Sequence, residues 1–214
     1  MKKLFILFSL ILFTLSFSEG TYKVSFEKGV KISSAETSQN NAQIENLISS
    51  VFGPDTYSLT NIRKMLGFSG SATKEEEALA SSASVLLQNF LESSKFTLNE
   101  IHYVNSDTAD LSITTVTPDV ESYISSNEPA IEKRAEQYFK EISGKTVQQV
   151  DRDTANQDKY VPVLMAAYLS SVSENIKNIQ KTNTNKSDIR VQKVNGVWIL
   201  NEKILDELIY SPLF

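Results

Sequence analysis

Two predicted β-hairpins, far apart in the chain, constrain the fold more than any other feature of the sequence. In residues 96–113, apolar and polar side chains alternate on both sides of a polar turn at 105–108. The second hairpin turns at Asn195-Gly196, a pair typical of two-residue turns because both central residues need a positive φ. We expect the two hairpins, 96–113 and 188–201, to share one antiparallel sheet whose apolar side is covered by neighbouring helices.

The last strand of the second hairpin is apolar on both faces. Trp198 and Leu200 share one face, and Val197 and Ile199 share the other. This pattern predicts a central strand, or one that is covered on each side. Trp198 is expected to pack against the long helices and anchor the core, since a buried Trp removes about 150–250 Å² from water. Lining a ligand cavity is its alternative role.

Helices account for most of the remaining chain. The clearest start is Thr73, because a Thr with a Glu three residues later can satisfy two helix-end amides in a capping box. Pro129 is expected to split one helical stretch, since proline removes a backbone hydrogen bond inside a helix. Residues 33–43, rich in Ser, Asn and Gln, are interpreted as a linker, and 181–187 as a loop. A short strand or hairpin is predicted within 21–34, and helices over 44–52, 60–66, Thr73 to about Leu91, 118–126, 129–143, 153–181 and 202–210.

The first eighteen residues have the pattern of a secretory signal. Lys2-Lys3 precede the uncharged stretch 4–17, and Ser16-Phe17-Ser18 provides small residues at both positions required for a cut after Ser18. An uncleaved anchor helix is the alternative, but fourteen residues span about 21 Å against ~30 Å of hydrocarbon. We therefore expect an exported, soluble protein, periplasmic or extracellular, with no stable membrane insertion after cleavage.

Composition excludes several kinds of chemistry. The chain has no Cys, so thiol catalysis, thiolate metal sites and disulfides are impossible. Its single histidine, His102, cannot supply a relay that needs two imidazoles, and we expect it to face solvent or to be satisfied by its neighbours. The acidic stretch 151–158 lacks the central Gly and distal Glu of a calcium loop. The net charge of −5 disfavours nucleic acid, and neither a metal nor a cofactor is expected.

Two stretches carry a resemblance to known proteins. Residues 106–111 with Pro118-Asp119, and residues 194–202, are similar to hairpin motifs of small bacterial cell-envelope proteins of unknown function, many of them lipoproteins. The C-terminal part of those proteins resembles the NTF2-like and cystatin-like α+β superfamily. The likeness runs from residue 74 to the end. The chain lacks the Cys that carries lipid in that group, so the resemblance does not imply membrane tethering.

The resemblance implies a fold class and a domain organisation. The expected fold is α+β, NTF2-like or cystatin-like, with a curved antiparallel sheet of about four strands, the two hairpins, packed on several helices and often leaving a pocket. The expected domains are a cleaved signal peptide over 1–18, an N-terminal arm with a short strand and helices over 19–72, and the NTF2-like/cystatin-like domain over 73–214. The group has no assigned catalytic residues, so none is carried over.

The sequence thus favours a non-catalytic binding module of the cell envelope, whose partner is an unidentified small apolar or peptide ligand or an envelope protein. An exported hydrolase or isomerase that uses carboxylates with Tyr groups or His102 in an NTF2-like pocket is the alternative. A third possibility is a structural surface protein whose arm, 21–60, contacts other chains. The aromatic candidates for lining a pocket are Trp198, Tyr138, Tyr160 and Tyr168.

Overall fold

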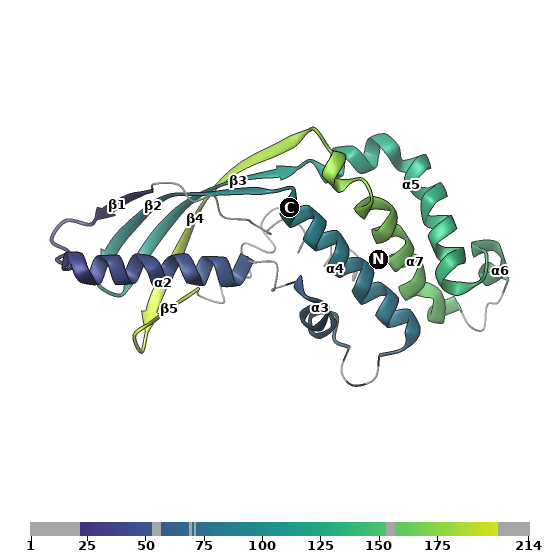
Figure 1. Ribbon diagram of the computed structural model, residues 1–214, viewed down its shortest axis with the longest axis horizontal. Coiled ribbons are helices and arrows are strands. Elements are labelled where there is room, and N and C mark those ends of the chain that lie inside the picture. Colours follow the sequence, from purple (N-terminus) through teal and green to yellow (C-terminus); the bar gives the residue numbers. More distant parts are fainter. Residues whose placement is uncertain (1–21, 53–56, 69, 71, 153–156, 201–214) are drawn as a thin grey trace. The chain divides into compact units, whose positions relative to one another are not determined.

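The computed structural model describes residues 22–52, 57–68, 70, 72–152 and 157–200 of the 214-residue chain. The predicted signal peptide, 1–18, and the predicted last helix, 202–210, lie outside the described residues. The described chain forms two compact units (Figure 1). The sheet unit consists of residues 22–52, 94–117 and 183–200, and the helical unit of 57–93 and 118–182, with the gaps given above. The predicted arm over 19–72 therefore contributes to both units.

The sheet unit is built on a five-stranded mixed sheet with the strand order β1-β2-β3-β4-β5. Its strands are β1 (Lys23–Phe26), β2 (Lys95–Asn105), β3 (Thr108–Pro118), β4 (Thr182–Val194) and β5 (Val197–Leu200). β1 runs parallel to β2, whereas β2 with β3 and β4 with β5 are antiparallel. The prediction of an α+β fold is confirmed. The predicted all-antiparallel sheet of about four strands is wrong, because β1 adds a parallel fifth strand through a crossover connection.

Both predicted hairpins are present, and they share one sheet through β3 and β4. Asn195 has a φ of 53° and Gly196 a φ of 82°, so the turn uses the positive φ values that predicted it. The first turn is shorter than expected, with two residues, Ser106 and Asp107, between the strands. The register shifts between Leu98 and Glu100, where a bulge accounts for the change in apolar phase.

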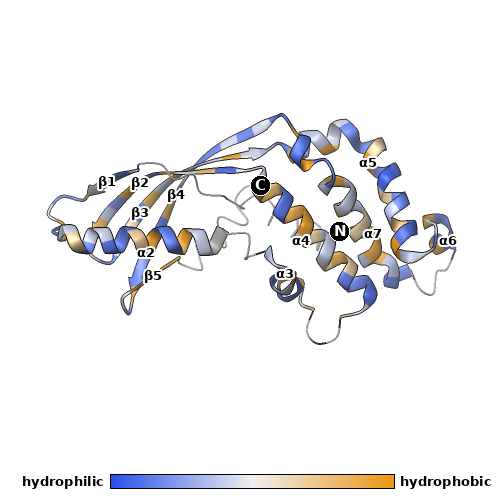
Figure 2. Ribbon diagram, in the orientation of Figure 1, coloured by the Kyte–Doolittle hydropathy of each residue, from blue (hydrophilic) through white to orange (hydrophobic). Residues whose placement is uncertain are grey.

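The prediction that the last strand is central or covered on both sides is wrong. β5 is an edge strand, the last in the order of the sheet, and the side chains of Val197 and Ile199 are 62% and 40% exposed. Trp198 and Leu200, on the opposite face, are buried. The same alternation continues along β2, β3 and the second half of β4, and the changes between orange and blue along these strands in Figure 2 follow it. The sheet therefore has one apolar face and one face that no described element covers, a common arrangement in antiparallel sheets.

One long helix, α2 (Ser34–Phe52), covers the apolar face, so the predicted linker over 33–43 is wrong. Asn40 Oδ1 accepts hydrogen bonds from Trp198 Nε1 at 3.2 Å and from Lys193 Nζ at 3.0 Å. Ser and Asn are weak helix formers, but tertiary contacts made by the inward-facing positions override that preference. The prediction that Trp198 belongs to the core is confirmed by its 2% exposure. Its helical partner in this unit is α2.

The helical unit packs α7 (Gln157–Ser173) against both α4 (Lys74–Glu92) and α5 (Val120–Ser143), as Figure 1 shows. Shorter elements complete it: α3 (Leu59–Met65), α6 (Val147–Asp151) and the 3₁₀ turn η2 (Ile176–Asn178). The predicted capping box at the start of α4 is confirmed. Thr73 Oγ1 accepts from the Glu76 amide at 3.2 Å, and Glu76 Oε2 accepts from the Thr73 amide at 2.8 Å.

Two predicted helix boundaries differ from the structure. α5 runs unbroken through Pro129, which is exposed, as is Ser125, the residue whose carbonyl loses its helical partner. Water can satisfy that carbonyl, which removes much of the reason for a break. α7 ends at Ser173, so the predicted helix over 153–181 is too long. The predicted loop over 181–187 is wrong, because β4 begins at Thr182 with exposed polar residues whose sequence shows no alternation.

Candidate functional site

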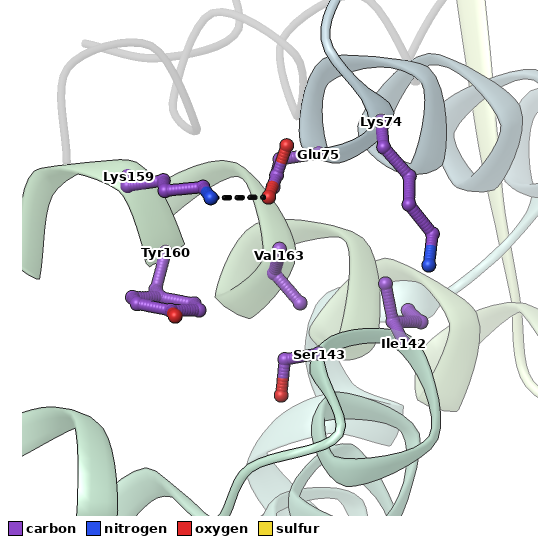
Figure 3. A pocket seen from close by; sticks show the side chains of 7 residues that line it. All are labelled: Lys74, Glu75, Ile142, Ser143, Lys159, Tyr160 and Val163. Atoms are coloured by element: carbon purple, nitrogen blue, oxygen red, sulfur yellow. Dashed lines mark ion pairs between the residues drawn. The ribbon is translucent and has the colours of Figure 1, made fainter. Parts of the chain in front are cut away.

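A cavity of about 130 Å³ opens in the helical unit where three helix ends meet. The first turn of α4 contributes Lys74 and Glu75, and the first turn of α7 contributes Lys159 and Tyr160. The remaining lining residues are Ile142 and Ser143 from the end of α5 and Val163 from α7. Figure 3 shows these side chains around the cavity.

The floor of the cavity is apolar and closely packed. Tyr160, 9% exposed, packs edge-to-face on Phe139 with the ring centroids 6.3 Å apart. Val163 is buried beside them in the same apolar cluster, and Ile142 packs against that cluster. Lys145 Nζ lies 4.9 Å from the centroid of the Tyr160 ring, within cation–π range. No group in the described part of the chain hydrogen-bonds to the Tyr160 hydroxyl, so that hydroxyl remains available to a ligand.

The rim of the cavity carries a local positive charge in an acidic protein. Lys159 Nζ pairs with Glu75 Oε1 at 3.4 Å. Within the described residues Lys74 makes no ion pair, and its side chain extends along the cavity toward Ile142 in Figure 3. A hydrogen bond with its own backbone amide, and the neighbouring Lys159, hold the pKa of Glu75 below its usual range, so this carboxylate stays ionised. Among the residues that line the cavity, two lysines against one carboxylate give +1, whereas the whole chain carries −5.

The hydroxyl of Ser143 is held by the backbone and is not placed to act as a nucleophile. It donates toward the carbonyl oxygens of Phe139 and Lys145, at 2.7 Å and 3.1 Å, and accepts from the Lys145 amide at 3.0 Å. A serine nucleophile needs a general base within hydrogen-bond reach. The cavity offers none, because Glu75 is ionised but paired with Lys159. The arrangement suits binding through charge and apolar contact.

Of the four predicted pocket residues, the structure brings Tyr160 to this cavity. Tyr138 lies elsewhere on α5, donating to Glu174 with the Arg134 guanidinium 4.3 Å from its ring. Arg134 and Tyr138 together lower the pKa of Glu174 to about 2. Tyr168 is half-buried on α7, and Trp198 lies in the core of the sheet unit.

The residues that sequence reasoning missed are charged or aliphatic ones at helix ends. The predicted capping box already placed Lys74 and Glu75 in the first turn of a helix, and the predicted helix over 129–143 ends where α5 ends, at Ser143. Nothing in the sequence showed that these two helix ends would meet the first turn of α7. The signal that could have been used was the clustering of Lys residues at predicted helix ends in an otherwise acidic chain.

His102 lies on the uncovered face of the sheet, where the sequence predicted a satisfied or solvent-facing histidine. The Ser25 hydroxyl donates to a Glu100 carboxylate oxygen and lies 2.7 Å from His102 Nδ1. This hydroxyl has one hydrogen, which it donates to Glu100, and the role of Nδ1 in the second contact depends on the tautomer of the imidazole. Its other nitrogen, Nε2, lies 3.6 Å from Glu27.

The neighbours of His102 belong to a polar row that ties the strands together. Across the strand pair His102 faces Asp110, which forms a two-point ion pair with Arg190 at 2.6 and 2.7 Å. Arg190 holds the pKa of Asp110 below its usual range. The side chain of His102 is 33% exposed on the uncovered sheet face, and His102 is not among the residues that line the cavity of the helical unit. This geometry does not support the alternative in which His102 serves a hydrolase.

Two further kinds of feature are absent from the described part of the chain. No group of three or more His, Asp or Glu side chains there is arranged to hold a metal ion. None of its helices combines the length and the apolar character needed to cross a membrane. The stretch that resembled a calcium loop is only partly described, since 153–156 fall outside the described residues.

Comparison with known proteins gives no relative: no protein-family model, no curated protein and no solved structure matches the chain. The fold and the cavity define the class of the molecule as an α+β protein with a small, positively charged cavity in its helical unit. Its function has to be inferred from that cavity and from the surfaces around it.

Proposed function

We propose that this chain is an exported, non-catalytic binding module of the bacterial cell envelope, and that the cavity of its helical unit holds a ligand with a small apolar body and one anionic group. The observation that carries the proposal is the position of Lys74, a cation without an ion pair in the described chain, beside the apolar surface of Ile142, Tyr160 and Val163. A carboxylate is the anion of choice, since ammonium–carboxylate hydrogen bonds are about twice as strong as neutral ones.

The volume of the cavity limits the size of the ligand. A cavity of about 150 Å³ holds one benzene ring, and this one measures about 130 Å³. Drug-sized ligands need pockets of roughly 300–1,000 Å³. The occupant is therefore a single ring or a short branched chain next to a carboxylate. Either a free small acid or the C-terminal residue of a peptide presents this chemistry, which fits the small apolar or peptide ligand proposed for the protein.

The finer fold assignment, NTF2-like or cystatin-like, is part of the same proposal and concerns the sheet unit. Support comes from α2, a single long helix laid against one face of a sheet whose strands are ordered by their position in the chain. The helices of the second unit are then insertions between α2 and β2 and between β3 and β4. The parallel pairing of β1 with β2 is the feature that departs from the antiparallel expectation.

Ligand binding is tested with benzoate, and with benzyl alcohol as the neutral molecule of similar shape. We expect the full chain to bind benzoate, with chemical-shift changes at Tyr160 and Val163, and to bind benzyl alcohol at least tenfold more weakly. Lys74→Ala should weaken benzoate binding by about tenfold or more, the loss expected for one hydrogen bond to a charged group. Titration calorimetry or NMR titration measures each affinity.

Lys133→Ala is the matched control for this experiment. Lys133 is exposed on α5, has no ion pair within the described residues and does not line the cavity. Its loss should leave benzoate binding unchanged while removing the same charge. Equal losses in both variants, equal affinity for benzyl alcohol, or no binding of either compound would contradict the proposal.

Export is tested by expressing the 214-residue chain in a bacterial host and measuring the mass of the product. We expect a mature protein that begins at Glu19 and is released with the periplasmic or extracellular fraction, because the first eighteen residues have the sequence pattern of a secretory signal. A replacement of Leu10 by Arg should block the cut by interrupting the apolar stretch. A full-length product in the cytoplasm or in the membrane fraction would contradict cleavage after Ser18.

A further inference from the structure

α7 carries an exposed apolar stripe on the side that does not pack against its neighbours. The stripe consists of Val161, Leu164, Met165 and Tyr168, spaced i, i+3, i+4 and i+7, so that they lie on one face of the helix. Val161 is 46% and Leu164 40% exposed, and the other two are half-buried. We call this set the α7 stripe.

The α7 stripe is additional to the core of the helical unit. The packed sides of α7 bury a separate set of residues against α4 and α5, including Val163, Ala166, Ala167 and Leu169. Single exposed apolar residues are normal on a protein surface. Four apolar residues along one face of a helix are unusual on a surface. Because the packed sides of α7 are also apolar, the helix has apolar residues on most of its sides, and such helices are usually buried. Within the described chain, nothing covers this one.

One flank of the α7 stripe is acidic. Glu128 and Glu132 are both exposed and lie four residues apart on α5, which packs against α7. Burial raises the pKa of the Tyr168 hydroxyl, and the negative charges of Glu128 and Glu132 raise it further. Neither carboxylate forms an ion pair within the described residues. Arg134, the nearest arginine along α5, is bound to Glu174 by two hydrogen bonds of 2.7 and 2.9 Å and is not available to neutralise them.

We propose that the α7 stripe is the docking site for one amphipathic helix of a partner protein, whose apolar face packs on Val161, Leu164 and Tyr168 and whose Lys or Arg residues face Glu128 and Glu132. An amphipathic helix docks by laying apolar side chains at i, i+3, i+4 and i+7 against an apolar surface, and the α7 stripe offers an apolar surface of matching spacing. This interaction is separate from ligand binding in the cavity, since no residue of the stripe lines it.

The negative charge of Glu128 and Glu132 favours a basic helix over the other molecules that could cover the α7 stripe. In a symmetric dimer the same patch meets itself, which would bring Glu128 and Glu132 close to their own copies. Anionic lipid would be repelled by the same two carboxylates. A helix with basic residues beside its apolar face gains both contacts, and its charge also sets the orientation in which it binds.

The proposal is tested with two synthetic 18-residue helices that share a leucine face at i, i+3, i+4 and i+7. One has lysine and the other glutamate at the flanking positions, and binding to the full chain is followed by fluorescence anisotropy at physiological salt. We expect the lysine peptide to bind and the glutamate peptide to bind at least tenfold more weakly. Leu164→Asp should weaken binding of the lysine peptide at least tenfold. Charge reversal at both carboxylates, Glu128→Lys with Glu132→Lys, should transfer the preference to the glutamate peptide.

Val85→Asp is the matched control, because Val85 is a 48% exposed apolar residue of α4 outside the stripe. It should leave binding unchanged, and Leu164→Ala provides a milder test if Leu164→Asp melts early. Equal losses at Val85 and Leu164, or a lysine preference that survives charge reversal, would overturn the proposal. So would dimerisation of the free chain, or binding to phosphatidylglycerol vesicles, that Leu164→Asp abolishes.

Discussion

Trp198→Ala should destabilise the sheet unit by about 3–5 kcal/mol, the cost of removing a large aromatic side chain from a core. Trp198 is 2% exposed, contacts Tyr103 edge-to-face with centroids 6.1 Å apart, and donates to Asn40. Truncation leaves a cavity between the sheet and α2. For a chain of this size the loss corresponds to a fall in Tm of roughly 6–20 °C, measured by circular dichroism.

Two variants separate packing from hydrogen bonding at this position. Trp198→Phe keeps most of the ring volume but removes the Nε1 donor, while Asn40 Oδ1 still accepts from Lys193. Its cost should be smaller, since a typical hydrogen bond contributes about 0.5–1.5 kcal/mol. Val197→Ala alters a neighbouring side chain that is 62% exposed and should change Tm by very little. If Trp198→Ala melted like the wild type, the core assignment of Trp198 would be wrong.

Phe139→Ala should have a comparable effect on the helical unit, with a loss of about 3–5 kcal/mol. Phe139 is fully buried and holds the ring of Tyr160 from the side, so its removal takes away both core volume and the support of the cavity floor. We therefore expect lower thermal stability, followed by calorimetry, and weaker benzoate binding in the same variant, even below its melting temperature.

Phe26→Ala is the control for the phenylalanine substitution itself. Phe26 is 42% exposed in the sheet unit and stacks on Tyr103 at 5.5 Å between ring centroids. Its truncation should cost about 1 kcal/mol, the value of an aromatic pair, and leave benzoate binding unchanged. A Phe139→Ala protein that binds benzoate as the wild type does would show that the Tyr160 ring needs no support from Phe139.

The sequence correctly predicted the features that depend only on residues close together in the chain. The positive φ values at Asn195 and Gly196 and the reciprocal bonds of Thr73 with Glu76 depend on a few neighbouring residues, and both predictions are confirmed. The start of α2 was missed because its stability depends on residues far away in the chain, Trp198 and Lys193, which contact Asn40. Periodicity could not detect the first half of β4, since its polar residues are exposed in succession.

The candidate site was only partly predictable for the same reason. Tyr160 was predicted as one of four aromatic residues able to line a pocket, but the cavity also depends on the meeting of α4, α5 and α7, which no spacing in the sequence encodes. The apolar residues on both faces of β5 wrongly predicted a central or doubly covered strand. Such a pattern depends on the residues of the strand itself and does not indicate which elements pack beside it. Val197 and Ile199 remain exposed at the end of the strand order.

The segments of the two units alternate along the sequence, and this order affects how the protein can fold during its synthesis. The sheet unit draws on three separate stretches, and Asn40 meets its partner Trp198 across 158 positions of sequence. During translation, α2 therefore cannot pack against β5 until almost the whole polypeptide has been made. Contacts between distant positions form late and slowly. The sheet unit can therefore be completed only after β5 has been synthesised.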